Sequence, residues 1–255
     1  MTATPRNWFD RGGQGYARFR PDYPPELAAH LARLAPRRGC AVDLGCGSGQ
    51  LTTRLAAHFD RVIGLDPSQD QVDHALPHPR VRYRRAAAEA TGLPDGAAHL
   101  IAAAQAAHWF DQPAFHAETR RIAAPGAVLA LVSYGLLRLE DEALNDRFAC
   151  FYRDGIGRFW PPERQLVDSG YADLHFPFAE LPAPALSIRR DWDLAGFLGY
   201  VGTWSAVRRA REAGRDAVLD DFAQDLSRLW GPPLARRRVI WPLAMRIGRV
   251  SPLQG

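Results

Sequence analysis

A glycine-rich segment near residue 45 constrains the fold of this chain more than any other feature. The apolar run Ala41-Val42-Asp43-Leu44 has the character of a buried strand, and it leads directly into Gly45-Cys46-Gly47-Ser48-Gly49-Gln50. Alternating glycines allow the backbone to take positive φ and to approach a ligand closely. A helix that begins near Gly49 would direct its unpaired N–H groups at the same place. The sequence therefore predicts a strand, a ligand-binding turn and a helix from residue 41 onward.

A second buried strand narrows the ligand to a nucleotide or nucleoside. Arg61-Val62-Ile63-Gly64-Leu65-Asp66 ends in a carboxylate, and an acidic residue about 20 positions after the first glycine accepts hydrogen bonds from ribose hydroxyls. The third glycine falls one position earlier than in the dinucleotide fingerprint G-x-G-x-x-G, and Asp43 lies two residues before Gly45. These details disfavour a dinucleotide.

The pattern Asp43-x-Gly45-x-Gly47-x-Gly49 resembles the first motif of class I S-adenosylmethionine-dependent methyltransferases. The resemblance covers residues 39–134. It implies a Rossmann-like α/β fold with a seven-stranded sheet, its last strand antiparallel, helices on both faces, and S-adenosylmethionine as the cofactor. An acidic residue beside the loop suits the cationic sulfonium. The cofactor-binding residues that it implies in this part of the chain are Asp43, Gly45, Cys46, Gly47, Gln50, Asp66 and Pro67.

The N-terminal segment narrows the resemblance to one subgroup. Tyr16-x-x-x-Arg20-Pro21-x-Tyr23-Pro24 resembles the lid of methyltransferases related to trans-aconitate methyltransferase. By position, Tyr16 would shield the methionine part of the cofactor, and Arg20 would pair with its carboxylate through a forked guanidinium. A solvated arm whose aromatic rings pack on the domain is the alternative.

The segment after the third expected strand, Val81–Arg85, departs from the family. The family has an acidic residue here that accepts from the adenine amine, and this chain has Ala87. The resemblance then implies that backbone groups of Ala87 and Ala88 hold the adenine, or that Glu89 does so. Glu89 as an exposed helix residue is the alternative.

The fourth expected strand, His99–Ala104, leads into the second informative stretch. Ligands bind at the carboxyl ends of parallel strands, and Gln105-Ala106-Ala107-His108-Trp109-Phe110-Asp111 resembles a segment of the same subgroup. The resemblance implies that Gln105 binds the methionine part of the cofactor, and that His108 and Trp109 face the reacting methyl. His108 as an orienting or helix-capping residue, and Trp109 as plain packing, remain alternatives.

The chemistry of the acceptor decides the role of His108. A hydroxyl acceptor would benefit from a general base, for which His108 is the candidate. An ionised carboxylate needs no base, and an arginine such as Arg189 or Arg208 would then matter more.

The pattern changes after Gly135, where aromatic residues and prolines interleave with helical stretches. We expect one domain in three parts: residues 1–135 as the lid and cofactor-binding core, 136–235 as a mostly helical substrate cap with one core strand, and 236–255 with the last core strand. Asp173–Phe178 and Leu186–Arg190 are the candidate strands within the cap. The expected substrate-binding residues are Trp109, Tyr134, Trp160, Tyr200 and Trp204.

Composition excludes several classes of protein. With 255 residues and 47% apolar residues the chain fits one large soluble domain. The net charge of +4 comes from arginines spread along a chain without lysine, so no nucleic-acid partner is expected. Three cysteines that cannot all pair indicate a reduced, cytoplasmic protein, and no pattern predicts a metal site. Neither a signal peptide nor a membrane span is expected.

The sequence thus predicts a methyltransferase that acts on a small molecule, by O-methylation of a carboxylate or hydroxyl of a metabolite or natural product. We expect a monomer or homodimer. A nucleic-acid amino methyltransferase is disfavoured, because its Asn/Asp-Pro-Pro-aromatic motif is absent after the fourth strand. A protein that binds S-adenosylmethionine but catalyses a non-methylating reaction, such as a cyclisation, is the alternative.

Overall fold

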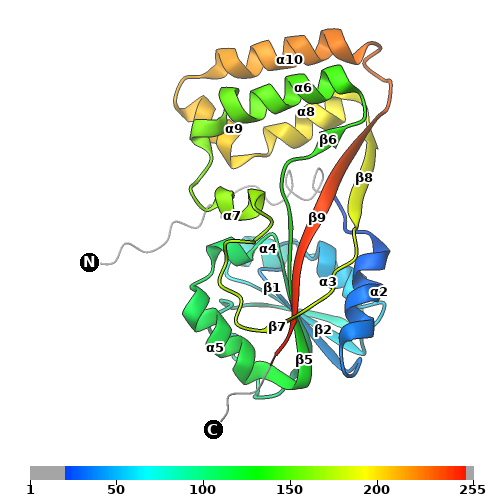
Figure 1. The fold of residues 1–255 in the computed structure, drawn as a ribbon, viewed down its shortest axis with the longest axis vertical. Coiled ribbons are helices and arrows are strands. Elements are labelled where there is room, and N and C mark those ends of the chain that lie inside the picture. The colour runs from blue at the N-terminus through cyan, green and yellow to red at the C-terminus, as the bar shows by residue number, and fades with distance from the viewer. Residues whose placement is uncertain (1–20, 251–255) are drawn as a thin grey trace, which may run out of the picture.

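One twisted sheet connects all parts of the chain that the structure describes. In the computed structural model, which describes residues 21–250, the strands pair in the order β3-β2-β1-β4-β5-β9-β6, and β7 and β8 also pair with β9 (Figure 1). The strands are β1 (Cys40–Leu44), β2 (Arg61–Asp66), β3 (Val81–Arg85), β4 (Ala98–Ala104), β5 (Ala123–Tyr134), β6 (Arg138–Leu139), β7 (Ala179–Leu181), β8 (Ser187–Trp192) and β9 (Arg237–Arg249).

The helices form two groups, one around the lower sheet and one above it. The lower helices are α2 (Pro25–Leu34), α3 (Gln50–Leu55), α4 (Gln69–Asp73) and α5 (Gln112–Ile122). The upper part contains α6 (Glu142–Cys150), α7 (Arg164–Asp168), α8 (Leu194–Gly202), α9 (Ser205–Glu212) and α10 (Asp216–Trp230). The part of the chain that the structure describes also has three short helical turns: η1 (Ala107–Trp109), η2 (Phe151–Gly155) and η3 (Gly157–Phe159).

The core sheet is parallel from β3 to β5 and is covered on both faces. β1 pairs in parallel with β2 and β4, β2 with β3, and β4 with β5. Leu27 of α2 and Leu51 of α3 belong to one apolar cluster, and Phe115 of α5 belongs to the other. All five residues of β1 are buried, as expected for a strand with helices above and below it. The carboxyl ends of these strands therefore share one edge, where the loops that follow them converge.

The long strand β9 joins the core to the cap. Leu243–Arg249 pairs antiparallel with β5 and, near its end, with β7, whereas residues 237–242 pair with β6 and β8. The core order β3-β2-β1-β4-β5-β9-β7 confirms the predicted seven strands with the last one antiparallel. Within residues 21–250 the sheet nevertheless has nine strands, because the 13-residue β9 extends beyond the core and pairs with β6 and β8 there.

The predicted strand over Asp173–Phe178 is wrong. The core strand is the next segment, β7, and Phe176 and Phe178 are buried side chains of the chain that leads to it. A Cβ atom added at Gly248 of β9 would lie 2.6 Å from Phe176 Cε1, so the rings pack closely over this glycine. Phe176 and Phe178 are therefore buried by packing on β9 and not as part of a paired strand. The second prediction, Leu186–Arg190, is confirmed as β8 with a shift of one to two residues.

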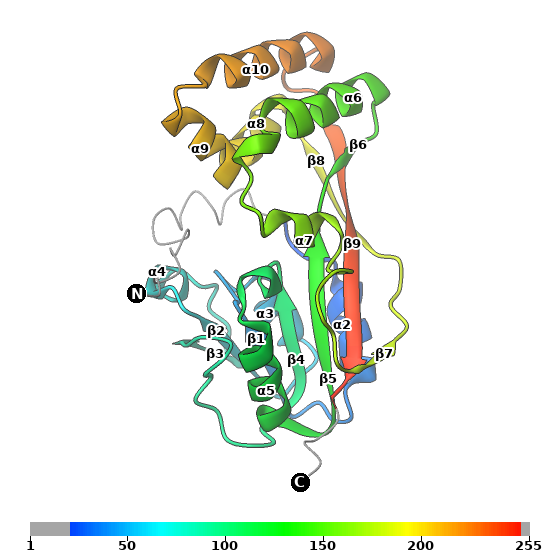
Figure 2. The same cartoon turned by 60° about the vertical axis from the view of Figure 1, so that its left-hand side comes forward.

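We call α6, α8, α9 and α10, with β6 and β8, the cap, which lies above the core in both ribbon views (Figures 1 and 2). Its interior is aromatic. The Phe148 ring lies 5.9 Å from the rings of Phe197 and Trp204, and Trp241 of β9 lies 5.4 Å from Tyr200. Edge-to-face contacts of this kind fix ring orientation as well as burying area. The cap is thus a packed layer anchored on the first half of β9.

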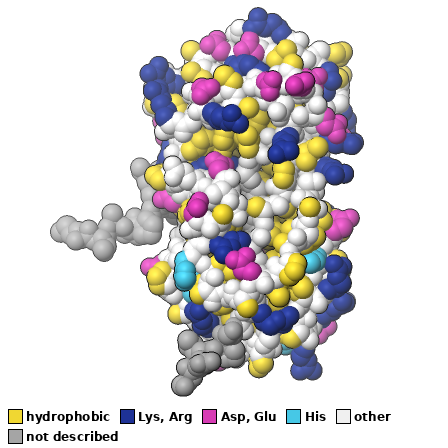
Figure 3. Space-filling view, in the orientation of Figure 1, with side chains coloured by type: hydrophobic (Ala, Val, Ile, Leu, Met, Phe, Trp, Pro, Cys, Tyr) yellow, Lys and Arg dark blue, Asp and Glu magenta, His cyan; other side chains and the backbone are white. Residues whose placement is uncertain are grey.

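Surface charge is mixed on the face shown in Figure 3, where arginines and acidic residues are interspersed. Among residues 21–250, no helix is both long enough and apolar enough to cross a bilayer.

Candidate functional site

The glycine loop after β1 leaves space for a ligand at one position. Gly45, Gly47 and Gly49 all have positive φ, at 65°, 53° and 89°. An added Cβ would lie 2.4 Å from Ala106 Cβ at Gly45 and 2.1 Å from Tyr83 Oη at Gly49, so packing requires both glycines. At Gly47 the nearest atom would be Gln71 Oε1 at 3.7 Å. The loop is therefore tight at both ends and open in the middle, and α3 begins directly after it.

Asp66 closes the loop from the end of β2. Its Oδ2 accepts a hydrogen bond from Gly47 N at 2.8 Å, and its Oδ1 accepts one from Ser68 N at 2.9 Å. Burial raises the pKa of this carboxyl, and the two backbone N–H groups partly offset the rise. Each carboxylate oxygen has a second lone pair, so Asp66 can hold the loop and still accept from a ligand hydroxyl.

Asp43 provides a buried acceptor beneath the loop. The residue is 1% exposed, and its Oδ2 accepts from Thr52 Oγ1 at 2.6 Å. Its Oδ1 has no hydrogen-bond partner among the residues that the structure describes. Burial raises the pKa of Asp43 to about 7. An uncompensated acceptor next to an open glycine loop fits a cationic cofactor such as S-adenosylmethionine.

This pKa predicts a pH-dependent cofactor affinity. A cation favours the ionised carboxylate, so binding should lower the pKa of Asp43 from about 7 and release a proton. The dissociation constant should then fall as pH rises from about 6 to 8, by up to tenfold for each unit by which binding lowers the pKa. Calorimetry in two buffers of different ionisation enthalpy measures the released proton directly. Asp43→Asn should bind with little pH dependence; a variant as pH-dependent as wild type would show that another group titrates.

The other residues predicted around the cofactor occupy different positions relative to the loop. Cys46 is buried within it, and Gln50 Nε2 donates to Ser48 Oγ at 2.9 Å. Pro67 is exposed, and its carbonyl accepts from Arg85 Nε at 3.0 Å. Gln71, which was not predicted, is buried with Oε1 unpartnered among the described residues. It follows the N-cap of α4, Ser68, and only the folded chain brings it to the loop.

The segment after β3 is held in place by side chains. Ala87 pairs with Ala90 in an isolated bridge, and Ala88 is buried. Glu89 Oε1 accepts from Asp111 N at 2.9 Å, which ties this segment to the start of α5. Glu89 lies in a turn, so its placement on a helix was wrong. The roles of Ala87 and Ala88 at adenine stay predictions.

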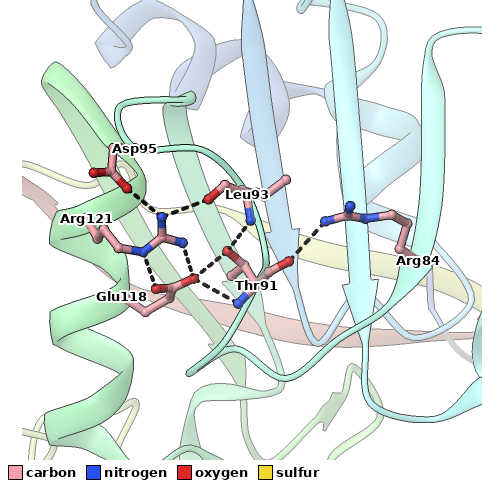
Figure 4. Close-up of polar contacts among 6 residues, drawn as sticks. All are labelled: Arg84, Thr91, Leu93, Asp95, Glu118 and Arg121. Atoms are coloured by element: carbon pink, nitrogen blue, oxygen red, sulfur yellow. Dashed lines mark hydrogen bonds and ion pairs between the residues drawn. The ribbon is translucent and has the colours of Figure 1, made fainter.

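A charged network fixes the next part of the same segment (Figure 4). Arg121 of α5 donates from Nε and Nη2 to the two oxygens of Glu118, both at 2.7 Å, and from Nη1 to Leu93 O and Asp95 Oδ1. Glu118 also accepts from Thr91 N at 2.8 Å. Hydrogen bonds from Arg121 hold the pKa of Glu118 at about 2, against the upward effect of burial and with help from Thr91. The network thus clamps residues 91–95 onto α5.

Glu118→Gln should reduce the free energy of unfolding by about 1–3 kcal/mol at pH 7, because a buried charge-assisted network loses its anion. The folded pKa of about 2 lies below the ordinary 4.5, so this stabilisation is complete above about 4.5 and is lost as pH falls toward 2. Urea titrations at pH 7 and pH 3 measure it, and the variant should differ less from wild type at pH 3. Asp95→Asn is the matched control, since Asp95 is 82% exposed and should change stability by under about 0.5 kcal/mol. Equal losses of unfolding free energy in Glu118→Gln and Asp95→Asn would contradict the proposed role of Glu118 in this network.

Gln105 directly follows β4 and has a strained backbone conformation. Its φ is +56°, its N–H donates to Val132 O at 2.9 Å, and its Nε2 donates to Tyr134 O at 2.6 Å. A non-glycine residue with positive φ persists where surrounding contacts enforce it, and such residues concentrate at functional sites. The two bonds to β5 supply that enforcement here.

His108 lies in η1 against a buried tyrosine. Its Nδ1 is 3.0 Å from Tyr171 Oη, and its ring centroid is 4.9 Å from that of Trp109. Burial raises the pKa of Tyr171, which also has positive φ, at 66°. Asp111, whose carboxylate accepts from Ala114 N, caps α5, so the helix-capping alternative for His108 is wrong.

A cavity of about 430 Å³ opens between the core edge and the cap. Gln105, His108 and the cap residue Arg208 line it. The five predicted substrate-binding residues line it as well: Trp109, Tyr134, Trp160, Tyr200 and Trp204. Contact with a substrate stays a prediction for all of them. Arg189 does not belong to this cavity; it is exposed on β8, where its Nε donates to Ser187 Oγ at 3.2 Å.

Several lining residues were not predicted from the sequence, among them Tyr152, Arg164, Arg209, Arg211 and Trp241. Tyr16 and Arg20 lie outside the described residues, so their lid roles stay predictions. Asp22, near the start of the described chain, pairs with Arg54 of α3. The chain therefore enters the described part beside the helix that follows the glycine loop.

Comparisons with known proteins agree with this geometry. Residues 42–131 match the family model described as a methyltransferase domain. A protein of Dictyostelium discoideum named as a methyltransferase is 36% identical over 231 residues, which cover 88% of this chain and 87% of that one. The solved structure of a type II methyltransferase from Anaeromyxobacter dehalogenans is 49% identical, covers 92% of this chain and 99% of its own, and superposes with a TM-score of 0.85. Trans-aconitate 2-methyltransferase of Methylobacterium radiotolerans is 38% identical over 123 residues, 46% of each chain.

The chain belongs to the class I S-adenosylmethionine-dependent methyltransferases, and S-adenosylmethionine is its cofactor. Within residues 21–250, no three His, Cys, Asp or Glu side chains gather in a way that could hold a metal ion.

Proposed function

We propose that this enzyme methylates an oxygen of a small carboxylate, a metabolite or natural product, in the cytoplasm. The observation that carries the proposal is the lining of the cavity, where aromatic rings stand with four arginines, Arg164, Arg208, Arg209 and Arg211. No aspartate or glutamate is among its described lining residues. Guanidinium groups match the planar carboxylate, and rings accommodate an apolar body. One relative is named for an anionic substrate, trans-aconitate.

The work left to the protein in such a reaction is orientation and exclusion of water. The cofactor, when bound, supplies an electrophilic methyl group. A carboxylate is ionised at pH 7 and is itself the nucleophile. The residues around the cavity then need to hold one carboxylate oxygen in line, within about 3–3.5 Å of the methyl carbon. The strained Gln105 and its bonds to β5 would keep the floor of the site rigid.

In this proposal His108 is a hydrogen-bond donor. Burial keeps Tyr171 protonated by raising its pKa, so its hydroxyl can donate to Nδ1 across the 3.0 Å contact. The proton of a neutral His108 is then on Nε2, where it can donate to an acceptor oxygen. A base would need the opposite tautomer, with Nδ1–H donating to Tyr171.

A panel of acceptors tests the proposal. Aryl and alkyl carboxylates, each beside its amide and its alcohol, are incubated with enzyme and S-adenosylmethionine, and products are identified by mass spectrometry. We expect carboxylates to gain one methylene in mass with equimolar S-adenosylhomocysteine. Gain confined to alcohols, or to amides at nitrogen, would overturn the carboxylate assignment. Conversion of an acceptor without S-adenosylhomocysteine would favour the non-methylating alternative.

A further inference from the structure

Arg164, the first residue of α7, stands out among the arginines around the cavity. α7 lies at the level where the cap meets the core (Figure 2). The side chain is 20% exposed, and its guanidinium carbon lies 4.7 Å from the ring centroid of Trp160. Stacking on an indole holds a guanidinium flat and leaves its edge available for planar hydrogen bonds.

The inner edge of the guanidinium is already fixed by the protein. Arg164 Nε lies 2.9 Å from Tyr152 Oη and 3.0 Å from Asp168 Oδ1. Tyr152 Oη in turn donates to the Asp168 carboxylate, at 3.0 and 3.1 Å to its two oxygens. Burial raises the pKa of Tyr152, so its hydroxyl keeps the proton that it donates. The three side chains form a closed triad that sets the orientation of the guanidinium.

The outer edge has no such partner. Nη1 and Nη2 of Arg164 make no hydrogen bond to any residue that the structure describes, although Arg164 lines the cavity. A guanidinium has five donors, and the triad uses one. The other three cavity arginines are placed differently. Arg208 is 45% exposed beside Glu212, Arg209 Nη1 donates to Phe159 O at 3.2 Å, and Arg211 is exposed. Water screens the charge of Arg164 less than that of Arg208.

Arg164 is also fixed relative to His108. The chain turns directly after α7, where Tyr171 N donates to Leu166 O at 2.8 Å, and Tyr171 Oη then meets His108 Nδ1. A five-residue helix and one turn thus connect the two groups on the wall of the same cavity.

We propose that Arg164 binds the anionic group of the methyl acceptor through Nη1 and Nη2, with Tyr152 and Asp168 as positioning residues. The acceptor class is a carboxylate on an apolar or aromatic body that packs against Trp160 and Trp204. This inference rests on the proposed function and adds the residue that selects its substrate class.

Tryptophan fluorescence titrations test it, with 3-phenylpropanoate and 3-phenylpropanamide as probes and S-adenosylhomocysteine present. Wild type should bind the carboxylate at least about tenfold tighter than the amide. Arg164→Gln should abolish that preference, and Arg164→Lys should keep part of it, because an ammonium retains the charge without the fork. Tyr152→Phe should reduce the preference less than Arg164→Gln does. Arg153→Gln, an exposed arginine of η2 outside the cavity, is the charge-matched control and should equal wild type.

Equal binding of the two probes by wild type would overturn the inference, as would an undiminished carboxylate preference in both Arg164 variants. Melting temperatures identify a variant that fails to fold. If Arg164→Gln fails to fold, Arg164→Lys still tests the inference. Phenyl phosphate tests whether the site prefers a phosphate to a carboxylate. If wild type binds phenyl phosphate more tightly than 3-phenylpropanoate, and Arg164→Gln loses this binding, the carboxylate class is overturned. Carboxylate methylation that is unchanged in Arg164→Gln contradicts this inference alone. Arg164-dependent carboxylate binding with methyl transfer only to alcohols contradicts the proposed function alone.

Discussion

His108→Ala should lower kcat/KM for a carboxylate acceptor about 10²-fold, because the acceptor oxygen loses a positioned donor next to the methyl group. The affinity for S-adenosylmethionine should stay near wild type, since His108 is assigned to the acceptor. At saturating S-adenosylmethionine the wild-type rate should vary little from pH 6 to 9, because a carboxylate is already ionised throughout. His108→Gln, which keeps an N–H donor, should recover part of the loss.

The opposite result would identify a base. A base role predicts that wild-type activity falls as pH falls through 6–7, and that this pH dependence is absent in His108→Ala. It also predicts that His108→Ala lowers turnover by about 10²–10⁴-fold. These results together would show that His108 accepts a proton from a hydroxyl acceptor. Tyr171→Phe separates the two roles further. Without the Tyr171 hydroxyl the donor tautomer loses its support, so the donor role predicts a loss of turnover with an unchanged flat profile. Stability of each variant is checked by thermal unfolding.

Asp66→Ala should weaken S-adenosylmethionine binding by about 1.5–3 kcal/mol, or roughly 10- to 150-fold, as expected for charge-assisted hydrogen bonds. Two losses combine, because the ribose hydroxyls lose their acceptor and Gly47 N loses the contact that shapes the open part of the loop. Isothermal titration calorimetry measures the effect. Asp60→Ala, which removes an exposed carboxylate just before the opposite end of β2, should bind like wild type. Wild-type affinity in Asp66→Ala would remove Asp66 from the cofactor site.

The geometry of the glycine loop could be predicted because its information is local. The strand, the three glycines and Asp43 are nearly contiguous in the sequence. Each glycine has a positive φ, and two of them have a close contact, that other residue types would not tolerate. Asp66 follows because the end of one parallel strand must lie beside the end of its neighbour. The roles of Tyr16 and Arg20 in the lid remain predictions.

The acceptor half could be predicted only in outline. Aromatic residues in the cap pointed to Trp160, Tyr200 and Trp204, which do reach one cavity. Arg164 could not be singled out from so many arginines, because its position depends on Tyr152 and Asp168 and on where a five-residue helix lies. The false strand near Phe176 has a similar cause, since burial of alternate rings looks the same whether a neighbouring backbone pairs with the segment or not.

The long strand β9 has a consequence for how this protein folds. It follows every other helix and strand that the structure describes, yet it completes the core beside β5 and the cap beside β8. During synthesis, both layers therefore emerge from the ribosome before the segment that completes them. Neither can reach its final packing until β9 inserts, and earlier intermediates expose apolar edges that chaperones would recognise. Denaturation should accordingly remove core and cap together in one cooperative transition, with the same midpoint by cap tryptophan fluorescence and by circular dichroism.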